Sequence, residues 1–261
     1  MERGAVTAAR LPVVLLHALA LDSSMWSAQS RALRERGHPV VAFDQRGFGS
    51  APLGDAPPTL DVVADDLARL LDERRVERAV LAGSSMGGYV AMAFLRRHPC
   101  RVAGLALLSA RATADTPQAR AQRLRFAELV ANEATRSATV ELTVPHLVGA
   151  TTRGNRPDVV AAVRASAHSA DPTALAWAQR AIAAREDSTA TLSATAVPAV
   201  VIAGAEDELT SPEESRYVAD VLPRGRLVTV EGAGHLTPLE APAAVSRALC
   251  DLVEEIGASE S

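Results

Sequence analysis

Gly83-Ser84-Ser85-Met86-Gly87 is the stretch of sequence that decides the fold of this chain. It follows a largely apolar run over residues 78–82, which reads as a strand, and it precedes a helix-like stretch over residues 88–95. A G-x-S-x-G sequence between a strand and a helix is typical of a tight, strained turn that lifts the central hydroxyl clear of a sheet. Ser84 has no glycine two positions to either side, so Ser85 is the predicted nucleophile.

Two later loops carry the partners that a nucleophilic serine requires. Residues 197–204 read as a buried parallel strand, because they are apolar, rich in β-branched side chains and ended by glycine, and Asp207 follows them. Residues 226–230 read as the next strand, and His235 lies in the glycine-containing loop behind it. Because sites in open parallel sheets form at the carboxyl ends of the strands, we expect Asp207 and His235 to meet Ser85 there.

These three residue types fit one chemistry. A histidine takes the proton of the attacking serine and later returns it to the leaving group, while a carboxylate fixes the histidine tautomer and stabilises the imidazolium. We therefore predict Ser85, His235 and Asp207 as the catalytic residues. Glu206 and Glu208 flank Asp207 and stay open as alternative acids.

An oxyanion that forms during such a reaction needs two backbone N–H donors. One donor is predicted to be Met86, the residue after the nucleophile. The other is predicted to be Leu19, in the loop that follows the apolar run over residues 11–16.

With these residues in hand, the chain resembles the α/β-hydrolase superfamily over nearly its whole length. The resemblance rests on the 83–87 motif, on the D-x-R-G-x-G segment at residues 44–49, and on the acid and histidine loops at residues 204–207 and 232–235. The loop at residues 17–26 is most similar to that of enol-lactone hydrolases and related small esterases. Two positions depart from the family pattern: Ala18 stands where glycine is usual, and Ser50 comes one position early.

The resemblance implies an α/β fold: a mostly parallel sheet of about six to seven strands, flanked by helices and carrying a helical cap. The alternation of strand-like and helix-like segments indeed stops after the apolar run at residues 104–109 and resumes at Val197. We therefore expect a core formed by residues 1–110 and 196–261, and a cap formed by residues 111–195. The helical spacing of apolar residues, together with residues typical of helix starts, predicts cap helices near residues 117–135, 140–148, 157–168 and 172–185.

A cap of this kind excludes water and shapes the acyl pocket. The candidate substrate-binding residues are Trp26, Phe126, His146, Leu147 and Trp177. The alternative for each is ordinary packing within the cap, because amphipathic helices need an apolar face anyway.

Several charged residues near these motifs have a structural interpretation as well as a functional one. Asp44 is expected to serve a turn, and Arg46 is expected to form a buried ion pair. Arg111, Arg153 and Arg156 either meet an anionic substrate or lie on the surface.

Composition excludes other classes of protein. The net charge is −4, without a basic block that would indicate a nucleic-acid partner. The sequence contains no lysine, so all 27 basic residues are arginine, which excludes a Schiff-base lysine, a P-loop lysine and a lysine-assisted serine hydrolase. Cys100 and Cys250 read as structural thiols, and the histidines show no metal-binding spacing, so neither a cofactor nor a metal is expected.

The first twenty residues resemble an export leader: Arg3 and Arg10 precede the apolar run over residues 11–16, and small residues follow it. Cleavage there would remove a core strand together with the loop of Leu19, so a cytoplasmic protein is expected. No apolar run reaches transmembrane length.

The sequence as a whole predicts a serine hydrolase that acts on a small-molecule ester or lactone, without a cofactor. Carbon–carbon bond hydrolysis, perhydrolysis and acyl transfer use the same three residues and stay open. So does a different class, a ligand-binding receptor or a biosynthetic cyclase on a hydrolase scaffold. The aspartate nucleophile of haloalkane dehalogenases is excluded, because the position is Ser85.

Overall fold

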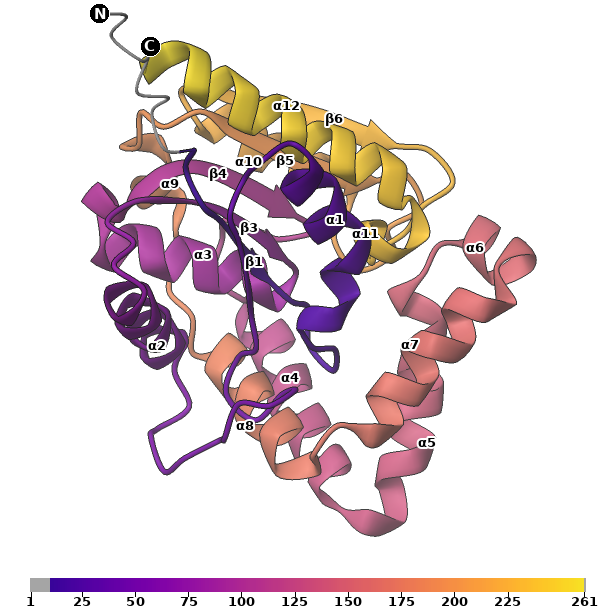
Figure 1. Cartoon of the computed structure of the whole chain (residues 1–261). Coiled ribbons are helices and arrows are strands. Elements are labelled where there is room, and N and C mark those ends of the chain that lie inside the picture. The colour runs from indigo at the N-terminus through magenta and orange to yellow at the C-terminus, as the bar shows by residue number, and fades with distance from the viewer. Residues whose placement is uncertain (1–9, 261) are drawn as a thin grey trace, which may run out of the picture.

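The centre of the molecule is one six-stranded parallel sheet (Figure 1). The computed structural model describes residues 10–260. The strands are β1 (Val13–Leu16), β2 (Val40–Phe43), β3 (Ala79–Ser84), β4 (Val102–Leu108), β5 (Ala199–Gly204) and β6 (Gly225–Val230). Their order is β2-β1-β3-β4-β5-β6, and every neighbouring pair is parallel. The carboxyl ends of the strands therefore share one edge of the sheet, as predicted.

The sheet is covered by helices on both faces, which explains why its inner strands are apolar throughout. Val13 and Leu15 point into the core under α1 (Ser27–Glu35) and α12 (Pro242–Glu260). Val14 and Leu16 point into the core on the other face. That face is covered by α2 (Leu60–Glu73), α3 (Met86–Arg97) and α10 (Pro212–Val221). The alternation follows from the two-residue period of a strand, and it leaves β1, β3, β4 and β5 buried along their whole length. The short elements η1 (Ser23–Trp26), η2 (Pro99–Arg101) and α11 (Thr237–Glu240) lie in the connections.

A set of helices, here called the helical insertion, separates β4 from β5. Its members are α4 (Pro117–Ala131), α5 (Glu133–Thr143), η3 (Val144–Leu147), α6 (Ala150–Asn155), α7 (Pro157–Ser169), α8 (Pro172–Ala183) and α9 (Thr189–Ser193). In Figure 1, α5, α6 and α7 stand apart from the sheet, whereas α4 and α8 lie against its lower end.

The predicted helices at 157–168 and 172–185 agree with α7 and α8, and Asp171 caps α8 by accepting the N–H of Ala174 at 2.9 Å. The prediction of a single helix over 117–135 and of a separate helix from Val140 was wrong. The chain breaks at Asn132, whose side chain accepts the N–H of Ala134 at 2.9 Å and so begins α5. An asparagine with extended backbone is a favourable N-cap, and this local effect outweighs the continuous helical period.

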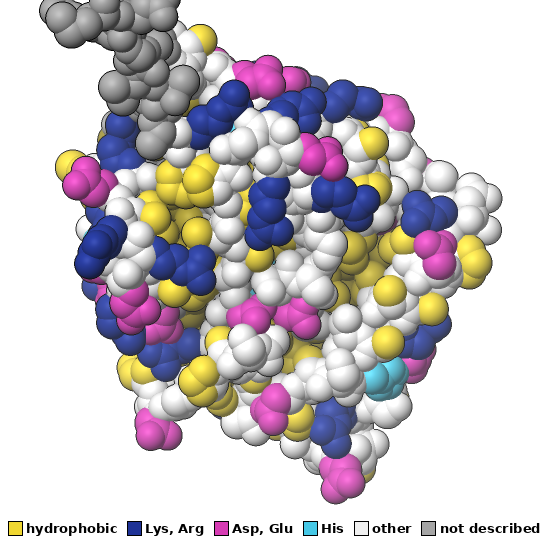
Figure 2. Space-filling model, in the orientation of Figure 1, with side chains coloured by type: hydrophobic (Ala, Val, Ile, Leu, Met, Phe, Trp, Pro, Cys, Tyr) yellow, Lys and Arg dark blue, Asp and Glu magenta, His cyan; other side chains and the backbone are white. Residues whose placement is uncertain are grey.

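Charges of both signs are interspersed over the face shown in Figure 2, without a block of one sign. Among residues 10–260, no helix is long and apolar enough to cross a membrane. In the same range, no three His, Cys, Asp or Glu side chains are grouped as metal ligands, and both cysteines are free thiols. Arg3 of the leader-like segment lies outside the described residues.

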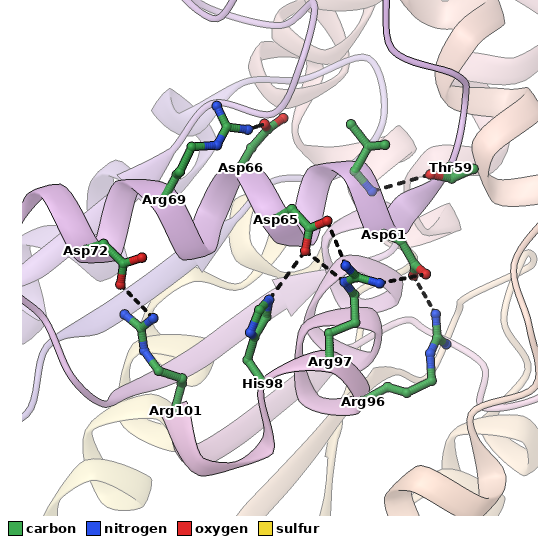
Figure 3. A network of polar contacts seen from close by, with 11 residues as sticks. Thr59, Asp61, Asp65, Asp66, Arg69, Asp72, Arg96, Arg97, His98 and Arg101 are labelled. Carbon is green, nitrogen blue, oxygen red and sulfur yellow. Dashed lines mark hydrogen bonds and ion pairs between the residues drawn. The ribbon is translucent and has the colours of Figure 1, made fainter.

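An ion-pair ladder joins α2 to the end of α3 (Figure 3). The acids are Asp61, Asp65 and Asp72 of α2, and their partners are Arg96, Arg97, His98 and Arg101. The pair between Arg97 and Asp65 is bidentate, with both N···O distances at 2.8 Å. Burial alone would raise the pKa of Asp65, but the hydrogen bonds and charge of Arg97 lower it below its ordinary value. The ladder fixes α2 against α3, the helix that begins directly after Ser85.

Candidate active site

Ser85 lies in a strained turn between β3 and α3. Its backbone has φ 52° and ψ −112°, a conformation that a residue with a Cβ rarely adopts. A Cβ at Gly83 would lie 2.2 Å from the carbonyl oxygen of Gly87, and one at Gly87 would lie 2.1 Å from that of Leu16. Only glycine fits these two positions, which explains the G-x-S-x-G sequence. The turn leaves the side chain of Ser85 partly exposed at the carboxyl edge of the sheet.

His235 connects Ser85 to Asp207. Its Nε2 lies 2.8 Å from Ser85 Oγ, and its Nδ1 lies 3.0 Å from each carboxylate oxygen of Asp207. Because the carboxylate accepts, Nδ1 carries the proton and Nε2 is free to accept the proton of the serine. The structure thus places the three predicted residues in one hydrogen-bonded chain, and His235 and Asp207 are both buried in it.

Asp207 is held in its ionised form. Burial alone would raise its pKa, but the hydrogen bond and charge of His235, together with the amide N–H groups of Thr210 and Leu209, lower the pKa below its ordinary value. The two amides donate to Asp207 Oδ1 at 3.0 and 2.9 Å. A buried carboxylate that faces an imidazole in this way stabilises the imidazolium that forms when the ring takes up a proton.

The two acids beside Asp207 face the helical insertion instead of His235. Glu206 accepts the amide N–H and the hydroxyl of Thr151, at 2.8 and 2.5 Å. Glu208 lies 2.7 Å from Nδ1 of His146 and accepts from Arg153 at 3.0 Å. These hydrogen bonds lower the pKa of both glutamates. Of the three candidate acids, Asp207 alone contacts the imidazole among residues 10–260.

The structure brings both predicted oxyanion donors near Ser85. Met86 is the first residue of α3, where the N–H groups of the first turn have no partner inside the helix. Leu19 lines the same cavity as Ser85, and its N–H has no acceptor in the described part of the chain. The left-handed residue of this loop is Ala20, with φ 67°, and Ala18 needs no positive φ. The departure from glycine at position 18 is therefore tolerated.

The buried side chain of His17 holds the loop that contains Leu19. Its Nε2 accepts the amide N–H of Gln45 at 2.9 Å, and its Nδ1 donates to the carbonyl of Ala18 at 2.9 Å. The side chain of Gln45 donates in return to the carbonyl of His17 at 2.7 Å. Burial lowers the pKa of His17 to about 4 and outweighs the hydrogen bond to Ala18, so the ring is neutral at physiological pH. This role of a histidine outside the catalytic set was not predicted.

The D-x-R-G-x-G segment is structural, as expected. Asp44 accepts the amide N–H of Ser23 at 2.8 Å and that of Ser50 at 3.0 Å, and so closes its turn. Arg46 forms a bidentate ion pair with Asp66 of α2, in which both side chains are mostly buried.

A cavity of about 460 Å³ opens over Ser85 and His235, between the sheet edge and the helical insertion. Of the five predicted substrate-binding residues, Phe126 and Leu147 line it. Aliphatic side chains also line it, among them Leu19, Val140, Val144, Leu175 and Ile182. The cavity can therefore take an apolar group beside Ser85.

The other three predicted lining residues do not reach the cavity, so these predictions were wrong. Trp26 is fully buried in the core on the α1 and α12 face, because η1 turns its ring toward the sheet. Trp177 packs into the opposite core, and its indole N–H donates to the carbonyl of Ala56 at 2.9 Å. His146 is exposed and lies against Glu208 at the edge of the insertion.

The polar lining was largely missed by sequence reasoning. Arg123 and Gln179 face each other from α4 and α8, with the guanidinium donating to the amide oxygen at 3.4 Å. Arg123 also pairs with Asp115, at 2.6 Å, and Arg185 pairs with the same carboxylate at 2.8 Å. These residues are spaced far apart in a segment without motifs, so no local pattern indicated them.

Of the three arginines considered for an anionic substrate, only Arg111 lines the cavity, and Glu214 pairs with it at 2.6 Å. Arg153 and Arg156 pair instead with Glu208 and Asp158, both at 3.0 Å.

Comparison with known proteins agrees with this fold. The family described as alpha/beta hydrolase fold matches residues 12–242. A Variovorax paradoxus protein named as a carbamate hydrolase is 31% identical over 94% of this chain and 92% of its own length. A thermophilic esterase from Thermogutta terrifontis is 37% identical with a TM-score of 0.91, over 96% of this chain and 92% of that one. The enol-lactonase from Burkholderia xenovorans is 28% identical with a TM-score of 0.85, over 97% and 94% of the two chains.

Proposed function

Because this chain belongs to the α/β-hydrolase fold family, we propose that it is a serine hydrolase that cleaves a carboxylic ester or a lactone through an acyl-enzyme on Ser85. The observation that carries the proposal is the continuous chain of hydrogen bonds from Ser85 through His235 to Asp207. The similarity to an esterase and to an enol-lactonase supports this substrate class.

In the first half of the reaction, Ser85 Oγ attacks the carbonyl carbon while Nε2 of His235 takes the hydroxyl proton. The carbonyl oxygen becomes an oxyanion and accepts the N–H groups of Leu19 and Met86. His235 then donates its proton to the leaving oxygen, and the carbon–oxygen bond breaks. An ester releases an alcohol at this point, whereas the leaving oxygen of a lactone stays attached to the acyl chain.

In the second half, water attacks the acyl-enzyme and His235 takes a proton from it. The oxyanion forms again between the same two N–H groups. Its collapse breaks the bond to Ser85, returns the proton to Oγ and releases the carboxylic acid. Asp207 stays ionised throughout and stabilises the imidazolium in both halves.

Residues 111–195 act in this proposal as a cap over the site. They supply Phe126 and Leu147 to the cavity, where these side chains would contact the apolar part of the substrate. Water excluded by such a cap strengthens the electrostatic interactions of the site.

A carbamate is a second candidate substrate, because the Variovorax paradoxus relative that matches over nearly its full length is named as a carbamate hydrolase. The same acyl-transfer steps would apply, with a carbamoyl group on Ser85.

The test is hydrolysis of a panel of p-nitrophenyl esters, aliphatic lactones and carbamates by the wild type and by Ser85→Ala and His235→Ala. We expect turnover in the wild type and a loss of kcat of at least about 10⁴-fold in both variants. The panel also ranks the three substrate classes.

Turnover that persists in folded Ser85→Ala would contradict the proposal. A wild type that turns over nothing but is labelled at Ser85 by a fluorophosphonate would indicate carbon–carbon hydrolysis or acyl transfer. A wild type that is neither active nor labelled would indicate a receptor or cyclase.

A further inference from the structure

Glu240, five residues after His235 in the sequence, has a buried carboxylate that the proposed reaction does not use. It accepts three backbone N–H groups. Its Oε2 accepts those of Gly149 and Gly234, at 2.7 and 2.9 Å, and its Oε1 accepts that of Leu236 at 2.9 Å. One side chain therefore occupies both of its oxygens with main-chain donors from two separate parts of the fold.

Two of these donors stand on either side of the catalytic base. Gly234 and Leu236 are the residues directly before and after His235. Holding both amides on one carboxylate fixes the backbone from which the imidazole extends. An error of about 1 Å in such a group can lower a rate 10²-fold, so this support bears directly on the reaction.

The third donor belongs to the helical insertion. Gly149 lies between η3 and α6, and its backbone is in direct contact with the histidine loop. A Cβ at Gly149 would lie 2.8 Å from the nitrogen of Gly234, and a Cβ at Gly234 would lie 2.3 Å from that of Gly149. The two backbones are too close for any other residue type, so their separation is set by direct contact.

The same stretch of the insertion, residues 146–153 and here called the docking segment, also rests on the loop of the catalytic acid. Thr151 is bound by Glu206, and His146 and Arg153 are bound by Glu208. Both glutamates adjoin Asp207 in the sequence. The insertion therefore contacts the acid loop and the histidine loop through one short segment, and Glu240 is the group that it shares with His235.

We propose that Glu240 is a positioning residue that holds His235 at hydrogen-bond distance from Ser85. Through Glu240, this geometry depends on how the docking segment packs against the histidine loop. The proposal rests on the proposed function, in which His235 is the base. It goes beyond that function because it assigns a role to a residue that touches no reacting atom, and because it couples the insertion to the chemistry.

The chemistry of the side chain makes the proposal testable. A glutamine at position 240 has one acceptor oxygen and one NH₂ group. Its oxygen can replace Oε2, which faces the N–H groups of Gly149 and Gly234, or Oε1, which faces that of Leu236. At the other position its NH₂ group would face an N–H donor and could not accept from it. Glu240→Gln should therefore break either the bond to Leu236 or the two bonds to Gly149 and Gly234, and in both cases it loosens the backbone beside His235 while the volume of the side chain is kept.

The experiment measures kcat per active site in Glu240→Gln, with sites counted by complete fluorophosphonate labelling of Ser85. We expect kcat per labelled site to fall by about 10-fold or more, with KM changed by less than about threefold. A merely structural role would reduce the number of labelled sites and leave kcat per site unchanged. The matched control is Glu141→Gln, which removes the pairs with Arg164 and His168 inside the insertion, at 3.1 and 2.7 Å, and should leave both constants as in the wild type.

Hydrogen exchange gives a second readout. In Glu240→Leu, which removes both acceptor oxygens, the amides of residues 148–150 and of residues 234–236 should lose protection together, because one carboxylate holds both. If Glu240→Gln does not fold, Glu240→Asp replaces it, since aspartate keeps the charge but is one methylene too short to reach both loops.

An unchanged kcat per labelled site in Glu240→Gln, or loss of protection in one of the two segments only in Glu240→Leu, would overturn the proposal. Both results differ from a failure of the proposed function, which would appear without any change at Glu240, as a wild type inactive on the panel or as turnover that persists in Ser85→Ala.

Discussion

Among the three consecutive acids at positions 206–208, the turn after β5 gives each carboxylate a different direction. Asp207 faces His235, while Glu206 and Glu208 face Thr151 and Arg153 of the insertion. Sequence reasoning favoured Asp207 but left its neighbours open, because consecutive residues in a loop can point in any of these directions. Each of the three acids therefore has its own partners, and Asp207 is the one that contacts His235.

Asp207→Asn tests this assignment. The amide cannot stabilise an imidazolium and favours the wrong tautomer of His235, so kcat should fall by about 10³- to 10⁴-fold. Glu206→Gln should lower kcat by less than about 10-fold, since its hydrogen bonds go to Thr151. Steady-state kinetics on the best ester of the panel measures both, and an equal loss in the two variants would contradict the assignment.

His17 should make the stability of the fold depend on pH. Its pKa is lowered by burial from 6.5 to about 4, so the unfolded chain binds a proton between these values that the folded chain does not. The contribution is complete above pH 6.5, decreases as the pH falls, and is lost at about pH 4. The shift corresponds to about 3 kcal/mol.

Denaturant unfolding of the wild type and of His17→Asn, between pH 7 and pH 4, measures this contribution. The asparagine has no proton to gain in this range, so the difference in free energy of unfolding between the two proteins should change by about 3 kcal/mol over the window. Two curves that stay parallel would show that His17 remains able to ionise in the folded protein.

At the scale of elements, α2 and α3 are joined by charge on their outer side and by apolar packing on their inner side. The acids of α2 repeat along one face, so they meet the arginines at the end of α3 as a ladder (Figure 3). Because α3 begins directly after Ser85, the ladder orients the helix whose first N–H groups face the proposed oxyanion.

Asp65→Asn removes the bidentate partner of Arg97 and should lower the free energy of unfolding by about 1 kcal/mol or less, because both side chains are partly exposed. The loss should shrink in 1 M salt, where the Debye length is about 3 Å. Asp55→Asn is the matched control, since Asp55 is exposed and has no partner among residues 10–260. A loss that persists in salt would mean that the ladder acts by packing.

At the scale of the whole molecule, the cavity exists only because the insertion folds back over the edge of the sheet. Phe126 comes from α4 and Leu147 from η3, and Ser85 and His235 come from the sheet side. The size of the cavity is thus a property of how the two parts meet, and its selectivity should respond to side chains of the insertion.

Phe126→Ala should enlarge the apolar part of the cavity and shift selectivity toward longer acyl chains by about 10-fold in the ratio of kcat/KM values. The ratio of p-nitrophenyl hexanoate to acetate hydrolysis measures this shift. Trp177→Phe is the control, because its ring lies in the core outside the cavity, and it should leave the ratio unchanged. The opposite pattern in the two variants would place the acyl pocket elsewhere.

The sequence by itself determined the parallel sheet, the strained turn at Ser85 and the two loops, after β5 and β6, that hold its hydrogen-bonded partners. These features depend on local signals: apolar runs, glycines that leave room for close backbones, and the loop that follows each strand. A local signal of this kind acts over a few residues and is readable without knowing the rest of the fold.

Only the tertiary structure decided which side chains line the cavity, that His17 supports the loop of Leu19, and that Glu240 joins the docking segment to the histidine loop. Trp26 and Trp177 looked like pocket residues in the sequence and proved to be core. The reason is physical: a large apolar side chain is equally favourable in a core or in a pocket, and the choice depends on packing between elements far apart in the chain. The role of a buried carboxylate such as Glu240 likewise depends on backbone N–H donors that lie 91 and 6 positions away in the sequence, and no local pattern indicates such contacts.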